Sequence, residues 1–284
     1  MHKHQPLVSI IIPCYNSANY IKETLFSVYQ QSYNNFEIIA IDDGSTDDTL
    51  NILYEFATKE PRLKVIPQKN TYYIKARVNA IQHAQGDYLV CLDSDDILGI
   101  DYLKVCIEAA EKDKELSIVY TDAILFDSQN KPWNLPKFEL RRFLLENCIY
   151  VTALIRKSHY DAAGGFDINM TQLEDWELFI SIIKNGGKIK QIHKSLFYYR
   201  QRSDNSSVSN LSNSNKLSDN MLRIYNKHYD FYKKNDIYFQ SLVSPAIKQY
   251  DEKLKFSKKF KNYLKLIFYK YFNKKRYNKL KNKE

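Results

Sequence analysis

The sequence predicts an α/β fold in which a mostly parallel, Rossmann-like sheet is covered by helices on both faces. Through the first half of the chain, short runs of β-branched and other apolar residues alternate with longer helical patterns. These runs are apolar almost without interruption, as strands are when helices bury both of their faces. The 284 residues suffice for one large domain with an appendage.

Three rounds of strand and helix are expected before residue 93. The expected strands span residues 7–12, 36–41, 63–66 and 88–92, and the expected helices span about 18–31, 46–58 and 74–84. Ser45 and Asp48 have the spacing of a capping box at the start of the second helix. Helices of this length are typical crossovers between parallel strands.

The second half of the chain is less regular. We expect a helix at about 102–112, strands at 117–120 and near 123–126, and helices at 138–146, 174–184, 216–234 and 254–272. Prolines indicate a loop over 127–137, and a Ser- and Asn-rich stretch indicates another over 203–215. We therefore expect one domain at 1–213 and a C-terminal helical extension at 214–284.

Composition excludes several classes of protein. Hydrophobic residues make up 44% of the chain and charged residues 26%, which is unlike a disordered or fibrous protein. The four cysteines have no metal-ligand spacing and indicate a reducing compartment. Because no segment has the length and apolarity of a signal-peptide core or a membrane span, we expect a cytoplasmic protein.

The net charge of +9 comes from one end of the chain. Residues 253–284 hold 13 Lys or Arg and one acid, which leaves 29 basic and 32 acidic residues in 1–252. The body is therefore slightly acidic and the tail strongly basic, so a body that binds nucleic acid is not expected.

Polar clusters follow three of the predicted strands at the point where each strand ends. They are Pro13-Cys14-Tyr15-Asn16, Asp42-Asp43-Gly44-Ser45 and Asp93-Ser94-Asp95-Asp96. Ligands of open parallel sheets bind at the carboxyl ends of the strands, which share one edge. We expect the three clusters to converge in a single site.

The acidic cluster is the strongest candidate for a metal site. Asp93, Asp95 and Asp96 repel one another unless a cation neutralises them, and carboxylates suit Mg²⁺ or Mn²⁺ together with substrate phosphates. An isolated acidic cluster is more often a solvated turn or a helix N-cap. The apolar strand that leads directly into these acids favours the metal site.

The second cluster has a partly structural explanation. Helix capping accounts for the residues from Gly44 onward, but not for Asp42 and Asp43, which are still at the strand end. A carboxylate there is placed to accept from a base N–H or a ribose hydroxyl. Tyr15 is placed to stack on a base, although simple packing is the alternative for a single tyrosine.

Five motifs in order give the chain a resemblance to family 2 glycosyltransferases of the GT-A fold. The three clusters above are joined by Ala76-Arg77-Val78-Asn79 and Glu174-Asp175-Trp176. Each motif is weak alone, but together they cover about residues 7–200. The resemblance implies an inverting transferase that uses a nucleoside-diphosphate sugar, most often a UDP-sugar, and Mn²⁺ or Mg²⁺. It also implies a nucleotide-binding half at about 1–96 and an acceptor half at about 97–213.

The resemblance assigns a role to each matching residue. Pro13, Tyr15, Asp43, Arg77 and Asp93 would bind the donor, and Asp95 would be the metal ligand, whereas Asp96 can be structural. Asp175 would be the general base, and Glu174 would support it or touch the acceptor. Two acids in the first turn of a helix are the alternative reading of this pair. Trp176 and the loop around Trp133 are expected at the acceptor.

The chain departs from the family pattern at one position. Many relatives have a histidine two residues after the arginine of Tyr198-Tyr199-Arg200, where this chain has Arg202. An arginine cannot ligate a metal, but it can pair with phosphate oxygens. We therefore expect Arg200 and Arg202 at the donor diphosphate, with activity still dependent on a divalent cation.

The basic tail suggests where the enzyme acts. In 253–284, aromatic and aliphatic residues recur at helical spacing between lysines, as in helices that lie on anionic membranes; packing on the body is the alternative. By family analogy, a hexosyl- or N-acetylhexosaminyltransferase bound to the inner face of the plasma membrane would extend glycan or lipid-linked acceptors of bacterial surface polysaccharides or lipooligosaccharides. The sequence names neither the sugar nor the acceptor, nor the oligomeric state.

Two other functions share part of this sequence pattern. A non-catalytic nucleotide-sugar-binding protein would bind donor without turnover, but every expected acid is present. A nucleotidyltransferase would use the nucleotide-binding half and the metal acids, but it gives no reason for Glu174-Asp175. The glycosyltransferase accounts for more of these residues.

Overall fold

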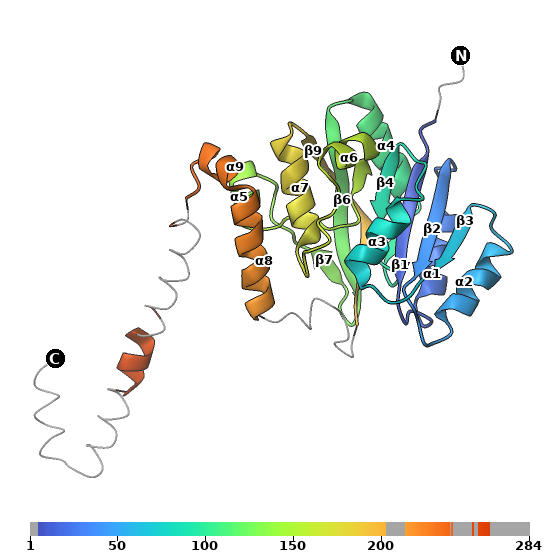
Figure 1. The fold of residues 1–284 in the computed structure, drawn as a ribbon, viewed down its shortest axis with the longest axis horizontal. Helices are drawn as coiled ribbons and strands as arrows, with labels where there is room; N and C mark the ends of the chain where they lie inside the picture. Colours follow the sequence, from blue (N-terminus) through green and yellow to red (C-terminus); the bar gives the residue numbers. More distant parts are fainter. Residues whose placement is uncertain (1–4, 203–213, 239, 241–251, 253–254, 262–284) are drawn as a thin grey trace, which may run out of the picture. The chain divides into compact units, whose positions relative to one another are not determined.

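The computed structural model describes residues 5–202, 214–238, 240, 252 and 255–261. The chain divides into two compact units, Met1–Tyr229 and Asp230–Glu284. The first unit contains a nine-stranded sheet with helices packed against it (Figure 1). It also holds every residue predicted for the site.

The N-terminal half of this unit follows the predicted alternation. The strands are β1 (Val8–Cys14), β2 (Phe36–Asp42), β3 (Leu63–Pro67), β4 (Tyr88–Cys91) and the short β5 (Ile97–Leu98). The helices are α1 (Ile21–Tyr29), α2 (Thr49–Ala57), α3 (Tyr73–Ile81) and α4 (Tyr102–Lys112). Each predicted strand and helix of this half is present, with boundaries that differ by a few residues at most helix ends.

The C-terminal half contains more strand than the sequence indicated. Its strands are β6 (Leu116–Asp127), β7 (Lys131–Trp133), β8 (Leu154–Arg156) and β9 (Lys188–Gln201). Its helices are α5 (Leu140–Phe143), α6 (Lys157–Ala162), α7 (Glu174–Lys184), α8 (Ser214–Lys227) and α9 (Tyr229–Lys234). The two strands predicted at 117–126 are one strand, and the predicted loop at 127–137 contains β7, which pairs with β6. The predicted helix at 138–146 is only the single turn of α5.

The sheet is parallel where the sequence pattern was most regular. Its order is β3-β2-β1-β4-β8-β6-β9-β5, and β1 lies parallel to both β2 and β4. Cys14 pairs with Asp42 at the ends of β1 and β2, so two of the predicted polar clusters begin at the same level. Beyond β4 the sheet is mixed: β8 is antiparallel to its two neighbours, whereas β6 and β9 are parallel.

Helices cover both faces of the sheet, as its buried strands require. In Figure 1, α3 and α7 lie on the face toward the viewer. The Gln31 side chain links the end of α1 to α4, because it accepts from the Leu103 N–H at 3.1 Å and donates to the Ser27 carbonyl. Residues Ile10, Ile11 and Ile12 of β1 are fully buried between the layers. The fold is thus the predicted α/β architecture.

The predicted capping box at the start of α2 is wrong. The helix begins at Thr49, and the Asp48 side chain makes no capping hydrogen bond. The Ser45 hydroxyl instead accepts from the Asn16 N–H at 3.0 Å, while Asp47 accepts from the Thr49 N–H at 3.0 Å. The Ser45 hydroxyl therefore bonds Asn16, in the loop after β1, instead of capping the helix as its spacing predicted.

Helix α8 belongs to the first unit rather than to a separate extension that begins at residue 214. Glu177 of α7 is fully buried and pairs with Lys227 at 2.8 Å and with His228 at 2.7 Å. Asn220 donates to the Thr171 hydroxyl at 2.8 Å and accepts from the Thr171 N–H at 3.1 Å. These contacts hold α8 against α7, and the division between the units falls after Tyr229.

Part of the predicted amphipathic tail, residues 255–261, is described in the second unit. Residues 255–261 are helical, and the side chains of Phe256 and Phe260 are exposed with stacked rings. Residues 253–254 and 262–284 lie outside the described residues, as do 203–213 of the predicted loop. Membrane binding by 253–284 therefore stays a prediction. Among the described helices, none combines the length and the apolarity needed to cross a bilayer.

A close backbone approach at Gly86 offers a test of the fold. A Cβ at this position would lie 2.6 Å from the Ser9 nitrogen and 2.8 Å from the Leu7 oxygen, so the junction of β1 and β4 would have to move. We expect Gly86→Ala to lower the free energy of unfolding by about 1–3 kcal/mol. Urea unfolding measures this, with the exposed Gln82→Ala, expected to cost less than about 0.5 kcal/mol, as the control. Equal midpoints for the two variants would contradict the packing described here.

Candidate active site

The loops after β1, β2 and β4 are hydrogen-bonded to one another. Ser17 is the central residue: its N–H donates to the Thr49 hydroxyl at 2.7 Å, and its hydroxyl lies 2.6 Å from that of Ser94. Asn16 accepts from the Thr46 N–H at 2.8 Å. The three polar clusters predicted to converge do meet at this edge of the sheet.

The residues predicted to hold the nucleotide base lie at the first two strand ends. Tyr15 is half-exposed and directly follows β1, whereas Pro13 is buried within it. Asp43 is buried, and its Oδ1 accepts from Gln68 Nε2 at 2.6 Å and from the Thr71 N–H at 2.8 Å. These bonds fix the Asp43 carboxylate, and the exposed ring of Tyr15 is available for stacking.

The acidic segment divides into one structural carboxylate and two that line the site. Asp96 is buried, and its Oδ1 accepts from the Arg200 N–H at 2.9 Å, which fastens the segment to β9. Burial raises the pKa of Asp96 well above its usual range, and the charges of Asp95 and Asp93 add to this rise. The Asp93 side chain is 38% exposed and that of Asp95 is 15% exposed, so these two remain in reach of a ligand.

Two arginines of the β9 end enclose the acidic segment. Arg202 binds Asp95 Oδ2 through Nε at 2.8 Å and through Nη2 at 2.7 Å. Arg200 donates from Nε to the Asp95 carbonyl at 2.7 Å and pairs with Glu23 of α1. Both guanidinium groups lie over the Tyr20 ring, at 5.0 Å for Arg200 and 4.7 Å for Arg202. The structure thus brings the predicted diphosphate arginines and the predicted metal ligand together.

Arg77 connects the acidic segment to helix α7. Its guanidinium is 2% exposed and bonds Asp93 Oδ1 at 3.0 Å and Glu174 Oε1 at 2.7 Å. The Tyr73 hydroxyl, one turn earlier in α3, donates to the other Glu174 oxygen at 3.2 Å. Burial lowers the pKa of Arg77, but the charges of Asp93 and Glu174 outweigh this and raise it above its ordinary value. Glu174 is therefore held in the interior by two partners.

Asp175, the predicted base, is held differently from its neighbour. It is half-buried, and its Oδ1 accepts from the Trp176 N–H at 2.7 Å while Oδ2 accepts from Asn147 at 3.2 Å. Burial and the charge of Glu174 raise the pKa of Asp175 to about 7, although the Trp176 N–H, Arg77 and Asn147 favour the charged form. A carboxylate with a pKa near 7 is well suited to accept a proton at neutral pH.

The donor set at Asp95 fits a divalent cation that is shared with a bound diphosphate. Burial raises the pKa of the Asp95 carboxyl, and Asp93 adds to this rise, although Arg202 lowers it. Among the residues described, no three acidic, His or Cys side chains group closely enough to enclose a metal. Mg²⁺ needs only one or two carboxylates when substrate phosphates complete its ligands.

The two tryptophans expected at the acceptor occupy different environments. The Trp176 indole is 4% exposed and donates its Nε1–H to the Phe143 carbonyl at 2.7 Å, so it has almost no surface to offer an acceptor. Trp133 is half-exposed, and its ring stacks on Tyr199 at 4.8 Å and on Tyr150 at 6.1 Å. Only Trp133 has an accessible surface.

Several residues of the site carried no signal in the sequence. Glu23 of α1, Asn147 after α5, Gln68 after β3 and Tyr73 of α3 each bond a predicted residue across the fold. Tyr73 precedes Arg77 by one helical turn, so the spacing of the two could have suggested a shared face. The other three are distant in sequence from their partners, and only the tertiary structure brings them together.

The chain matches the family model described as glycosyl transferase family 2 over residues 9–162. It is 30% identical over 244 residues to a chondroitin synthase of Pasteurella multocida (strain Pm70), across 81% of this chain and 25% of that protein. Across the chondroitin and hyaluronan synthases that it matches, the chain spans 22% to 31% of their length. A large part of each of these relatives has no counterpart here.

Other relatives match over more of their length. TuaG, a putative teichuronic acid biosynthesis glycosyltransferase of Bacillus subtilis (strain 168), is 30% identical over 224 residues, across 76% of this chain and 85% of that protein. The structure of S. aureus TarS 1–349 in complex with UDP-GlcNAc matches with a TM-score of 0.61 and 24% identity, across 69% of this chain and 59% of that one. This likeness shows the GT-A fold. Together with the family model, which covers more than half of the sequence, these matches show that the chain belongs to glycosyl transferase family 2.

Proposed function

We propose that this glycosyltransferase moves a sugar, with inversion, from a UDP-sugar to a hydroxyl of a glycan or lipid-linked acceptor in the synthesis of a bacterial surface polysaccharide. One observation carries the proposal. Buried Arg77 joins Asp93, in the donor segment, to Glu174, the neighbour of the general base Asp175. The groups that would bind the donor and activate the acceptor are thus held at one place by a single side chain.

The donor groups divide between the base and the diphosphate. Tyr15 stacks on the base, Asp43 accepts from it, and Pro13 shapes the pocket. Asp93 faces the ribose or the sugar, with Arg77 beneath it. Arg200 and Arg202 pair with the diphosphate, since a guanidinium offers two parallel N–H donors to phosphate oxygens. A divalent cation held by Asp95 would neutralise charge on the leaving diphosphate.

Asp175 removes the acceptor proton during transfer. The acceptor oxygen forms a bond to the anomeric carbon from the face opposite the diphosphate, as the bond from that carbon to the diphosphate oxygen breaks. The acceptor proton passes to the Asp175 carboxylate, and the leaving electron pair stays with the diphosphate. Glu174 is a positioning residue, because both of its oxygens are engaged by Arg77 and Tyr73.

The relatives support the choice of donor and acceptor. TarS was solved with UDP-GlcNAc, and TuaG is assigned to teichuronic acid biosynthesis. A hexosyl or N-acetylhexosaminyl group is therefore the proposed cargo. We place the enzyme at the inner face of the plasma membrane, where residues 253–284 carry the basic and aromatic pattern of a membrane-surface helix.

The role of Asp175 predicts a separation of donor binding from turnover. We expect Asp175→Asn to lower transfer by roughly 10²–10⁴-fold, because the amide cannot accept the proton. In a thermal-shift screen of UDP-, GDP- and dTDP-sugars with Mn²⁺, wild type and Asp175→Asn should be stabilised equally, and by UDP-sugars only. The exposed Asp161→Asn is the matched control and should behave as wild type. Near wild-type transfer by Asp175→Asn would contradict the assignment of Asp175 as the base. Donor binding without turnover in every protein tested, wild type included, would favour the non-catalytic nucleotide-sugar-binding protein.

The raised pKa of Asp175 predicts a specific pH dependence. Below a pH of about 7 the carboxyl is protonated and cannot accept the acceptor proton, so kcat/KM should fall tenfold for each further pH unit. Above a pH of about 7 the carboxyl is ionised, so kcat/KM should no longer rise with pH. Steady-state assays over a pH range of about 5 to 9 measure this. The residual kcat/KM of Asp175→Asn should not fall in the same way below a pH of about 7. A flat wild-type profile across this range would contradict the assignment.

The donor set at Asp95 predicts dependence on a divalent cation. Excess EDTA should reduce transfer by roughly a hundredfold or more, and added Mn²⁺ or Mg²⁺ should restore it, because the cation stabilises the leaving diphosphate. Asp95→Ala should also weaken the metal-dependent part of UDP binding, measured by calorimetry with and without Mn²⁺. Asp161→Ala, at an exposed acid, is the control. Full turnover in EDTA would overturn the role of the cation.

A further inference from the structure

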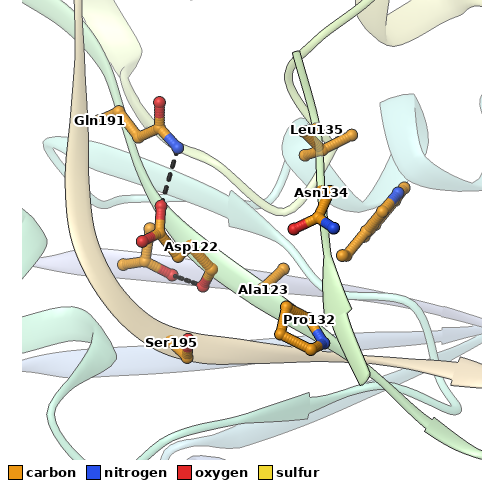
Figure 2. A pocket seen from close by; sticks show the side chains of 9 residues that line it. Asp122, Ala123, Pro132, Asn134, Leu135, Gln191 and Ser195 are labelled. Carbon is orange, nitrogen blue, oxygen red and sulfur yellow. Dashed lines mark hydrogen bonds between the residues drawn. The ribbon is translucent and has the colours of Figure 1, made fainter. Parts of the chain in front are cut away.

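A cavity of about 190 Å³ lies between β6, β7 and β9, and none of its described lining residues belongs to the three polar clusters at the strand ends. Figure 2 shows Asp122 and Gln191 on one side of it and Pro132, Asn134 and Leu135 on the other. Ser195 and Trp133 also line it. Pockets for drug-sized ligands measure roughly 300–1,000 Å³, so this one suits a single ring rather than a whole nucleotide sugar.

The cavity lies at an irregularity in the pairing of β6 with β9. Between Thr121 and Ala123 the β6 strand advances two residues, while its partner β9 advances five, from Ile192 to Phe197. The extra residues of β9 interrupt the regular pairing beside Asp122, and one of them, Ser195, lines the cavity. Bulges of this kind re-aim side chains and are frequent next to active sites. The strand β7 completes the wall through its pairing with β6.

The lining combines ordered hydrogen-bonding groups with an aromatic wall. Asp122 Oδ1 accepts from Gln191 Nε2 at 2.8 Å, and Gln191 Oε1 accepts from the Tyr120 hydroxyl at 3.2 Å, which fixes both side chains. A carboxylate and an amide still have further acceptor and donor positions after these bonds. Trp133 is held by its stack on Tyr199. Hydroxyl groups around a small apolar ring, as in a pyranose, match this arrangement.

The charge of the lining indicates which sugars fit. Asp122 is the one acid among the described residues that line the cavity, and it accepts hydrogen bonds when ionised. The His193 ring nitrogen Nδ1 lies 3.3 Å from its Oδ1, which leaves Oδ2 for a ligand. An anionic sugar would place a second carboxylate beside it, and like charges at close range repel. A neutral or N-acetylated pyranose presents hydroxyl and amide donors instead.

The aromatic residues at the wall of this cavity belong to the same chain segments as two residues that bond the site. Trp133 stacks on Tyr199, the neighbour of Arg200, which binds the acidic segment. It also stacks on Tyr150, three residues after Asn147, which bonds the base Asp175. A molecule in the cavity therefore touches Trp133, whose ring packs on Tyr199 and Tyr150.

We propose that this cavity is an acceptor subsite that binds one neutral or N-acetylated pyranose of an oligosaccharide acceptor, at a unit other than the one that reacts. The inference rests on the proposed function, because it assumes a glycan acceptor. The subsite selects an acceptor that already carries sugars. It thereby favours extension of a chain over its initiation.

The test uses the full chain on a glycan array with neutral, N-acetylated and uronate-bearing oligosaccharides. Wild type should bind neutral or N-acetylated glycans, and the best of these is then titrated by calorimetry. Asp122→Asn removes the charge and keeps the shape, and we expect a Kd at least about tenfold higher, as for loss of a hydrogen bond to a charged group. Asp161→Asn is the matched control and should bind as wild type.

A second variant guards against a folding defect in the first. Ser195 is exposed, so Ser195→Leu should fill the cavity without disturbing the core, and it should abolish glycan binding. The exposed Ser158→Leu on α6 is its control. The proposal is overturned if no glycan binds, if uronate glycans bind best, or if Ser195→Leu and its control bind alike.

Donor assays separate this proposal from the proposed function. UDP-sugar binding, followed by thermal shift, should be the same in wild type, Asp122→Asn and Ser195→Leu. If UDP-sugar is turned over and the cavity variants still bind glycan normally, the subsite is wrong and the transferase stands. If glycan binding depends on the cavity but no nucleotide sugar is bound, the proposed transferase is wrong, and the cavity is a glycan-binding site that serves no acceptor.

Discussion

The guanidinium of Arg77 is buried between two carboxylates that come from distant parts of the chain, and the geometry of the site depends on it. A buried charge costs several kcal/mol unless good partners compensate it, so Arg77 requires both Asp93 and Glu174 in place. That requirement fixes the acidic segment relative to the start of α7. Asp175 follows Glu174 directly, and its position is therefore set by a residue of α3. The pKa of Asp175 is raised by burial and by the charge of Glu174, whereas the Arg77 charge opposes this rise.

A second set of contacts fixes the acidic segment from the β9 side. Arg202 grips the Asp95 carboxylate, and Arg200 binds the backbone of the same segment while Asp96 holds the Arg200 N–H. The strand β9 also carries Tyr199, whose ring stacks on Trp133 at the wall of the cavity. The acidic segment and the cavity thus both depend on β9, and a change in its pairing with β6 would affect both.

The regular half of the fold could be predicted because each element there is specified locally. Apolar runs gave β1, β2 and β4, and amphipathic periodicity gave α4 and α7 with their boundaries. The long β9 could not be predicted in this way, because its exposed lysines break the apolar pattern and its pairing with β6 supplies the stability. The local pattern also predicted the wrong partner for Ser45, because its hydroxyl accepts from Asn16 in the loop after β1 and does not cap a helix.

The sequence by itself determined which loops form the site, since the carboxyl ends of parallel strands must share one edge of a sheet. It also identified the acids, the arginines and the family pattern that they follow. The tertiary structure alone decided what each side chain contacts. It engages Glu174 with Arg77 and Tyr73, buries Trp176 against Phe143 and leaves Trp133 beside a cavity. These outcomes depend on packing between elements that are far apart in the chain, and no local pattern encodes such distances.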